Sequence, residues 1–152
     1  MKETMHITKL LDDLYSGDPW IDVSVKGTLK NISASQAVKR MSAKTNSIWE
    51  IVNHLINWRL AVLQRVQGVI FPSPDNNFFE PVADTSEKAW VETLQQFDTT
   101  QQKWKELLAN FNDDYFSKTY SVNNQSYYEL IHGIIQHDAY HLGQIVLLSK
   151  LD

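Results

Sequence analysis

Apolar side chains recur at helical spacing along the last part of the chain, from Ser126 to Leu151, and predict one long, mostly buried helix. Ser126 and Glu129 fit a capping box, in which hydroxyl and carboxylate each bind a backbone N–H that the first turn leaves unpaired. At about 100° per residue, one stripe of this helix covers roughly 80° of its surface. The stripe consists of Leu130, Ile134, His137, His141, Ile145 and Leu148. Two histidines therefore interrupt a face that should point into the core.

A second strongly apolar segment runs from Asn46 or Ser47 to Gln67 and predicts another long helix, which Gly68 terminates. Its best-defined apolar face consists of Ile51, Leu55, Trp58 and Val62. His54 lies at the edge of this face, between an apolar and a polar flank. A histidine in that position can line a cavity, so His54 is a candidate functional residue.

Two further segments have the same helical pattern. Apolar positions from Thr4 to Ser16 predict a first helix, which Gly17-Asp18-Pro19 stops. Asp84 and Glu87 are predicted to cap a third long helix, whose apolar residues alternate spacings of four and three up to about Asn110. Each of these helices should pack one apolar face into a shared core.

A short helix is also expected where Ser33 and Gln36 fit a second capping box, and it is predicted to run through Arg40. Three long helices, the shorter first helix and this short extra one predict an all-α fold, a four-helix bundle with long connecting loops. The interior faces of such bundles are a common place for metal ligands.

Three connecting segments separate these helices. Trp20 to Ile32 has alternating apolar residues but no partner strand, so we expect an extended loop. Gly68 to Asp84 contains three prolines and three phenylalanines, so it should pack over a bundle end or form part of a pocket. Phe111 to Gln125 is predicted to be a polar, turn-rich loop.

Composition narrows the class of protein. With 152 residues and 43% apolar content, the chain suits one globular domain, expected to span residues 1–152. The net charge of −4 and the lack of a Lys/Arg cluster argue against nucleic acid or an anionic membrane as partner. No signal-like N-terminus and no run of about 18 apolar residues is present, so a cytoplasmic location is expected. The absence of cysteine excludes disulfides, thiolate ligands and a cysteine nucleophile.

Three histidines are candidate ligands of a metal ion. His137 and His141 stand at spacing i, i+4, with Cβ atoms about 6 Å apart on one helix face, so both imidazoles can reach one metal ion. Leaving two imidazoles unpaired in a core would cost about 1 to 3 kcal/mol each. If the helix that carries His54 faces the last helix, His54 completes a set that suits Zn, Ni or Fe(II) and leaves a position open. His132 points away from the stripe and His6 lies near the N-terminus, so neither is a candidate.

Three other polar residues are candidates to act beside the histidines. Asp138 stands where the H-E-x-x-H pattern of metalloproteases has its catalytic glutamate, and it either orients a ligand or forms a salt bridge to a neighbouring helix. Glu50, one turn before His54, either supports a ligand or forms a surface ion pair. Gln144 either hydrogen-bonds a ligand near His137 or contacts another helix.

The segments SIWEIVNHLINW and IIQHDAYHLGQI resemble the DinB/YfiT-like superfamily of bacterial four-helix bundles. The resemblance extends over nearly the whole chain, including GDPW after the first helix and SASQA before the second long-helix segment. It implies a divalent-metal site at three histidines, which correspond to His54, His137 and His141. It also implies a frequent homodimer and, in the better understood branches, metal-dependent transfer or isomerisation with low-molecular-weight thiols such as bacillithiol or mycothiol.

The leading hypothesis is a metal-dependent enzyme in which the three histidines hold one divalent cation, Zn or Ni first, with Fe or Mn as alternatives. The metal would depress the pKa of a small thiol, which would then attack an electrophilic small-molecule substrate. A hydrolase would use the same site to ionise water, with Glu50 or Asp138 as candidate bases. Two non-enzymatic alternatives stay open: a stress-related metal or small-molecule binding bundle without turnover, and a helical interaction protein whose histidines are only packed.

Overall fold

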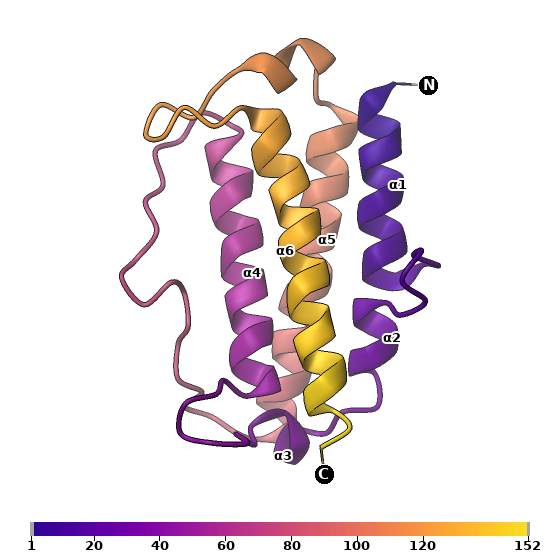
Figure 1. Cartoon of the computed structure of the whole chain (residues 1–152), viewed down its shortest axis with the longest axis vertical. Helices are drawn as coiled ribbons and strands as arrows, with labels where there is room; N and C mark the ends of the chain where they lie inside the picture. The colour runs from indigo at the N-terminus through magenta and orange to yellow at the C-terminus, as the bar shows by residue number, and fades with distance from the viewer. Residues whose placement is uncertain (1, 152) are drawn as a thin grey trace.

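The computed structural model describes residues 2–151, which form an all-α four-helix bundle and no β-strand (Figure 1). The four long helices are α1 (Glu3–Ser16), α4 (Ile48–Arg65), α5 (Glu87–Ala109) and α6 (Tyr127–Leu148). The short elements are α2 (Val25–Leu29), α3 (Ala34–Ala37) and a 3₁₀ helix, η1 (Asp113–Ser117). The predicted fold class is confirmed.

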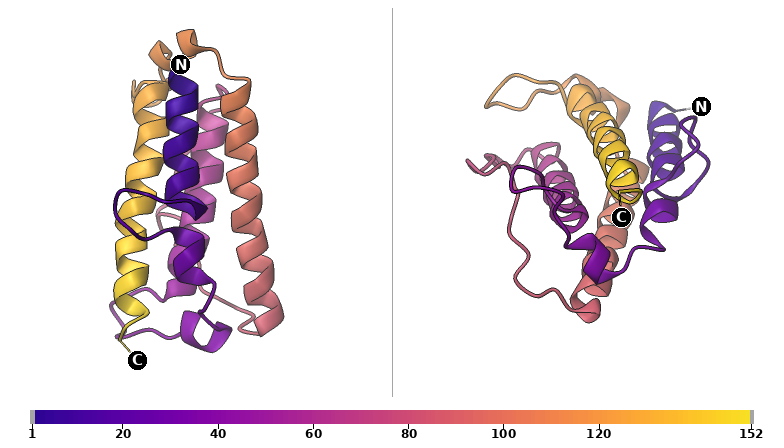
Figure 2. Two further views of the ribbon diagram at one scale, coloured as in Figure 1. Left: turned by 90° about the vertical axis from the view of Figure 1, so that its right-hand side faces the viewer. Right: turned by 60° about the horizontal axis from the view of Figure 1, so that its bottom comes forward.

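The direction of the four long helices determines where the long loops run. Figure 1 shows α1 and α6 running from top to bottom, whereas α4 and α5 run from bottom to top. α4 packs against α5 and α6, and α1 packs against the same two helices, so the four surround one core (Figure 2). Because α4 and α5 are parallel neighbours, the connection between them must return along the whole bundle. It does so along the outer side of α4 (Figure 1), and we call residues 68–86 the crossover loop.

Capping boxes begin three of the helices. Ser126 with Glu129 begins α6, as predicted, and Ser33 with Gln36 begins α3, as predicted. The same arrangement of Ser47 with Glu50 begins α4. In each box the serine hydroxyl and the Glu or Gln side chain each accept a hydrogen bond from a backbone N–H that the first turn leaves unpaired, so the starts of these helices are fixed locally by sequence.

Helix ends were predicted less well than helix starts. α3 stops at Ala37 instead of continuing through Arg40, and α6 stops at Leu148 instead of Leu151. α4 ends at Arg65, two residues before the predicted Gln67, and the N–H of Gly68, at a φ of 86°, donates to the Arg65 carbonyl at 3.0 Å. Gly68 thus terminates the helix as predicted, because a positive φ at this position suits glycine.

The prediction of an extended loop over Trp20–Ile32 was wrong, because α2 forms inside it. The Ser24 hydroxyl accepts a hydrogen bond from the Gly27 N–H at 3.2 Å and caps this short helix. Val25 and Leu29, four residues apart, are 0% and 3% exposed, so one helical face is buried. Burial of that face outweighs the alternating pattern that indicated an extended chain.

The predicted cap of the third long helix was also wrong by two residues. Ser86 is the N-cap of α5, and its hydroxyl accepts from the Ala89 N–H at 3.2 Å. Asp84 instead accepts from the Ser86 N–H at 2.9 Å, in the turn before the helix. Glu87 accepts from the Ala34 N–H at 2.9 Å, so its carboxylate caps a different helix, α3.

The segment from Phe111 to Gln125 contains η1 and is not the simple polar loop that was predicted. Phe111 and Tyr120 are 9% and 4% exposed and pack into the core. The segment therefore covers one end of the bundle with apolar side chains.

One buried polar network links all four long helices. Arg59 of α4 and Asp138 of α6 are both 0% exposed, and Arg59 Nε donates to Asp138 Oδ2 at 2.8 Å. Arg59 Nη1 donates to Gln101 Oε1 of α5 at 2.8 Å. Gln101 Nε2 in turn donates to Asp12 Oδ1 of α1 at 2.8 Å. The network fixes the relative positions of α4 and α6 because its charges have partners only in this packing.

No helix within residues 2–151 combines the length and the apolarity that crossing a bilayer requires.

Removing one member of the buried ion pair should destabilise the protein strongly. We expect Arg59→Met or Asp138→Leu alone to lower the free energy of unfolding by about 3 to 5 kcal/mol, because each leaves an uncompensated buried charge. The double variant should be more stable than either single variant. Urea unfolding followed by circular dichroism measures both effects. Lys88→Met, which breaks the exposed Lys88–Glu92 pair, serves as the control and should change stability by less than about 0.5 kcal/mol.

Candidate metal centre

Three imidazole rings converge between α4 and α6. His54 comes from α4, whereas His137 and His141 come from successive turns of α6. His54 Nε2 lies 3.0 Å from His137 Nε2 and 3.1 Å from His141 Nε2. One ring nitrogen from each histidine lies within 4.8 Å of the other two, so the set could hold a metal ion. The structure thus brings together the three histidines that the sequence singled out.

The orientation of His54 is fixed by the crossover loop. His54 Nδ1 lies 2.7 Å from the carbonyl oxygen of Asn77, which can only accept, so Nδ1 carries the proton. The Phe79 ring stacks on the His54 ring, with centroids 3.9 Å apart and planes 9° apart. Nε2 of the neutral ring therefore keeps its lone pair and points to the other two histidines.

His141 has an equivalent arrangement. Its Nδ1 lies 2.7 Å from the amide oxygen Oε1 of Gln144, one turn further along α6. Nδ1 therefore donates, and Nε2 again keeps a lone pair. The two lone pairs of His54 and His141 face each other at 3.1 Å with no proton between them. Such a contact is repulsive unless a cation lies between the two nitrogens, which is the chemistry of a metal site.

His137 completes the set on its more open side. Its side chain is 25% exposed, whereas His54 and His141 are 1% and 6% exposed. Its Nδ1 lies 4.0 Å from Asp138 Oδ1, and both atoms are buried without a hydrogen-bond partner. His137 Nε2, 3.0 Å from His54 Nε2, is the atom that faces the other two rings.

Burial keeps these imidazoles uncharged. Burial first, and the neighbouring His141 second, lower the pKa of His54 to about 4 and the pKa of His137 to about 3. Burial also lowers the pKa of His141, against the opposing effect of its hydrogen bond to Gln144. Neutral imidazole is the form that binds metal, so the site does not have to lose protons at neutral pH.

The three other polar candidates from the sequence, Asp138, Gln144 and Glu50, each bind a different partner. Asp138 forms the salt bridge to Arg59 of the neighbouring helix, one of its two expected roles. Gln144 holds His141, not His137. Glu50 accepts from the Ser47 N–H at 2.8 Å and pairs with Arg40 through Arg40 Nε at 2.9 Å. The carboxylate of Glu50 is thus committed to the start of α4 and to Arg40.

Sequence reasoning missed two residues that shape this centre. Asn77 binds His54 through its carbonyl and accepts from Trp58 Nε1 through its side chain at 3.1 Å. Asn77 and the next residue, Phe78, have φ angles of 52° and 62°, a conformation that asparagine tolerates better than most residues. The only signal was the turn composition PSPDNN, because periodicity does not show where a crossover loop passes. The second missed residue is Arg59, whose position within an apolar helix was the signal that could have found it.

A cavity of about 430 Å³ lies next to the histidines, between α4 and α6. His137 and Trp58 line it, together with Ser73 and Asn77 of the crossover loop. The crossover loop was expected to form part of a pocket, and it does so along the side of the bundle. The volume is within the usual range for small-molecule sites.

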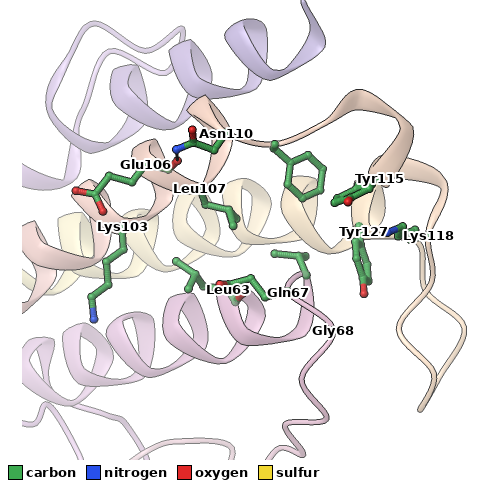
Figure 3. Close-up of a pocket in the computed structure, with 12 residues that line it drawn as sticks. Leu63, Gln67, Gly68, Lys103, Glu106, Leu107, Asn110, Tyr115, Lys118 and Tyr127 are labelled. Carbon is green, nitrogen blue, oxygen red and sulfur yellow. Dashed lines mark hydrogen bonds between the residues drawn. The ribbon is translucent and has the colours of Figure 1, made fainter.

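A second cavity, of about 670 Å³, lies between α4 and α5 near the end of the bundle (Figure 3). Leu63 and Gln67 face Lys103 and Leu107 across it. None of the three histidines lines this cavity, so its larger size does not make it the cavity of the metal centre.

Fold and site together define a helical-bundle protein with a buried three-histidine centre. The family model of the DinB superfamily matches residues 24–145. The chain belongs to the DinB superfamily, as its sequence pattern indicated. No curated protein and no solved structure matches the chain.

The metal-free protein should lose stability as the pH falls below about 6.5. The unfolded histidines bind protons near the ordinary pKa of 6.5, but folded His54 and His137 stay neutral until about pH 4 and 3. Stability is therefore fully present above pH 6.5 and falls by roughly 1 kcal/mol per pH unit for each histidine. Chelator-treated protein unfolded in urea between pH 7 and 5 measures this slope.

His54→Gln should reduce this slope, whereas His6→Gln, which changes an exposed histidine on α1, should leave it unchanged. An equal slope in wild type and His54→Gln would show that His54 titrates normally in the folded protein.

Proposed function

We propose that the protein binds one divalent cation through His54, His137 and His141 and uses it in a transfer reaction of a low-molecular-weight thiol. The observation that carries this proposal is the contact of 3.1 Å between two Nε2 lone pairs whose protons are committed elsewhere. Membership of the DinB superfamily supports the same site.

The donor set favours Zn or Ni, with Fe(II) and Mn as alternatives. Three neutral imidazoles suit borderline metals better than Mg or Ca, which prefer oxygen ligands. Nitrogens that share a metal at about 2.1 Å lie roughly 3.0 to 3.4 Å apart, which the observed separations of His54 Nε2 from its two neighbours approach. Three protein ligands leave a position for a substrate atom.

A divalent cation at this site supplies a lowered pKa for a thiol or a water molecule that binds beside it. The residues of the chain do the rest. Phe79 covers the His54 ring, and His137 provides the partly exposed edge that meets the cavity. Trp58, whose ring centroid lies 5.8 Å from that of His137, forms an apolar wall on which a substrate can lie.

The cavity favours a thiol over water as the nucleophile. Hydrolysis benefits from a carboxylate that accepts a proton from water, yet neither Glu50 nor Asp138 lines the cavity. The one acidic lining residue, Glu129, is held by the backbone N–H and the hydroxyl of Ser126. A thiol, with an ordinary pKa of about 8.5, needs less help to ionise at neutral pH.

Metal content tests the first part of the proposal. Protein reconstituted with Zn or Ni should contain about one equivalent per chain by elemental analysis. His54→Ala, His137→Ala and His141→Ala should each weaken binding by at least about 100-fold in competition with a chelator, because each removes one of three ligands. His132→Ala, on the same helix, is the matched control. If the reconstituted wild-type protein contained no metal, the proposal would be wrong, and the three histidines would be packed side chains without a ligand role.

Turnover tests the second part. The metal-loaded protein should accelerate the reaction of bacillithiol with a model electrophile, followed as loss of free thiol, and His141→Ala should abolish the acceleration. Esters and amides serve as the comparison substrates. Turnover of esters alone would favour a hydrolase, and no turnover with metal bound would favour a stress-related binding bundle.

A small-molecule substrate, a homodimer and a cytoplasmic location stay predictions, as do the absence of nucleic-acid and membrane partners.

A further inference from the structure

Arg65, near the end of α4, is a buried cation that no carboxylate neutralises. It is 6% exposed, and no acidic side chain within residues 2–151 forms an ion pair with it. The two other arginines differ in this respect, because Arg59 pairs with Asp138 and Arg40 pairs with Glu50. No Arg65 atom is among the buried side-chain atoms without a partner in the described part of the chain, so the unpaired Nη1 is open to the cavity that Arg65 lines.

Anchoring of the crossover loop explains only part of Arg65. Its Nε donates to the Phe71 carbonyl at 2.9 Å, and its Nη2 donates to the Ser73 hydroxyl at 2.9 Å. The guanidinium group has five N–H donors, so three remain without a partner among the described residues. The Trp58 and Tyr120 rings, whose centroids each lie 5.2 Å from Cζ, attract the positive charge, but no anionic group among the described residues pairs with it.

Arg65 lines the same cavity as His137. Its Cζ lies 5.2 Å from the centroid of the Trp58 ring, and that ring lies 5.8 Å from the ring of His137. The cavity therefore has a cation at one end, His137 as a partly exposed candidate metal ligand at the other, and the Trp58 ring between them.

The separation of the two ends follows from the helix. Arg65 comes 11 residues after His54, which corresponds to about 16 Å of helix rise. The arginine side chain points back toward the helix N-terminus, over Trp58, and recovers about a third of that distance. Roughly 10 Å thus separates the guanidinium group from the three imidazoles.

From these contacts we infer that the substrate carries a carboxylate that Arg65 binds, roughly 10 Å from the atom that meets the histidine centre. A carboxylate supplies the missing counter-charge, and its two oxygens match the free edge of the guanidinium fork. The inference rests on the proposed function, since it places the reacting end of the substrate at His137. Glu129, on the wall of the same cavity, accepts from Ser126 at 2.7 and 2.8 Å and offers a further acceptor to a ligand amine or hydroxyl.

A series of thiols of different length tests the inference on the cobalt-loaded protein. The probes are 3-mercaptopropionate, 6-mercaptohexanoate and 8-mercaptooctanoate, each compared with the alcohol of the same length. Sulfur-to-cobalt charge-transfer absorption reports binding of the thiol end, and its titration gives the dissociation constant. The two longer acids should bind about tenfold more tightly than their alcohols, and the shortest acid should show no advantage.

Substitutions of Arg65 identify the group that recognises the acid. Arg65→Gln should remove the advantage of the longer acids and leave the alcohols unchanged, whereas Arg65→Lys should keep part of it. Lys103→Gln, which removes a cation from the cavity between α4 and α5, is the matched control and should change nothing. Circular dichroism of each variant checks that the bundle is intact.

The wild-type comparison decides the inference even if Arg65→Gln does not fold. Equal binding of acids and alcohols at every length would overturn it, and so would an acid advantage that Arg65→Gln retains. If cobalt does not bind, the proposed function fails separately. In that case, calorimetry measures the affinities of octanoate and octanol for the wild type and for Arg65→Gln. Equal affinities of the wild type for octanoate and octanol would overturn the inference.

Discussion

The buried ion pair between Arg59 and Asp138 is the interaction on which the rest of the structure depends. Both side chains are fully buried, so each charge is stable only when it is paired with the other. Hydrogen bonds from Arg59 to Gln101 and from Gln101 to Asp12 connect the pair to α5 and α1. A shift of α6 along α4 would leave Arg59 unpaired at high cost. Asp138 stands next to His137 in the sequence, so the same pair sets the height at which two imidazoles of α6 meet the one of α4. The register of the bundle and the geometry of the histidine centre therefore have one cause.

The parallel arrangement of α4 and α5 explains why residues of the crossover loop contact His54 and Arg65. A connection between antiparallel neighbours could be a few residues long, but here the chain must travel back along the bundle (Figure 1). That route brings Asn77 and Phe79 to His54 and brings Ser73 to Arg65. Most of the crossover loop is exposed, and only Phe78, Phe79 and Val82 are partly buried, so the loop touches the bundle at a few aromatic and apolar positions near the histidines.

Much of this architecture is readable in the sequence, for local reasons. Capping boxes such as Ser126 with Glu129, and apolar stripes interrupted by histidines, are encoded within a single turn or a single helix face. The parts that were missed depend on partners distant in sequence. α2 forms because Val25 and Leu29 find a core to pack against, and Asn77 reaches His54 only because of the helix directions. Arg59 and Arg65 look alike in an apolar helix, and only the packed structure shows that one charge is balanced and the other is not.

The flat stack of Phe79 on His54 also has a stereochemical consequence. The phenyl ring covers His54 and lies edge-on to His141, and α4 and α6 carry the three histidines, so the partly exposed edge of His137 is the approach that the cavity offers. A substrate that enters along this direction with its carboxylate bound by Arg65, as proposed, would not be able to turn over before it reacts. Prochiral reactants would consequently show the same face every time, and the product would be a single enantiomer.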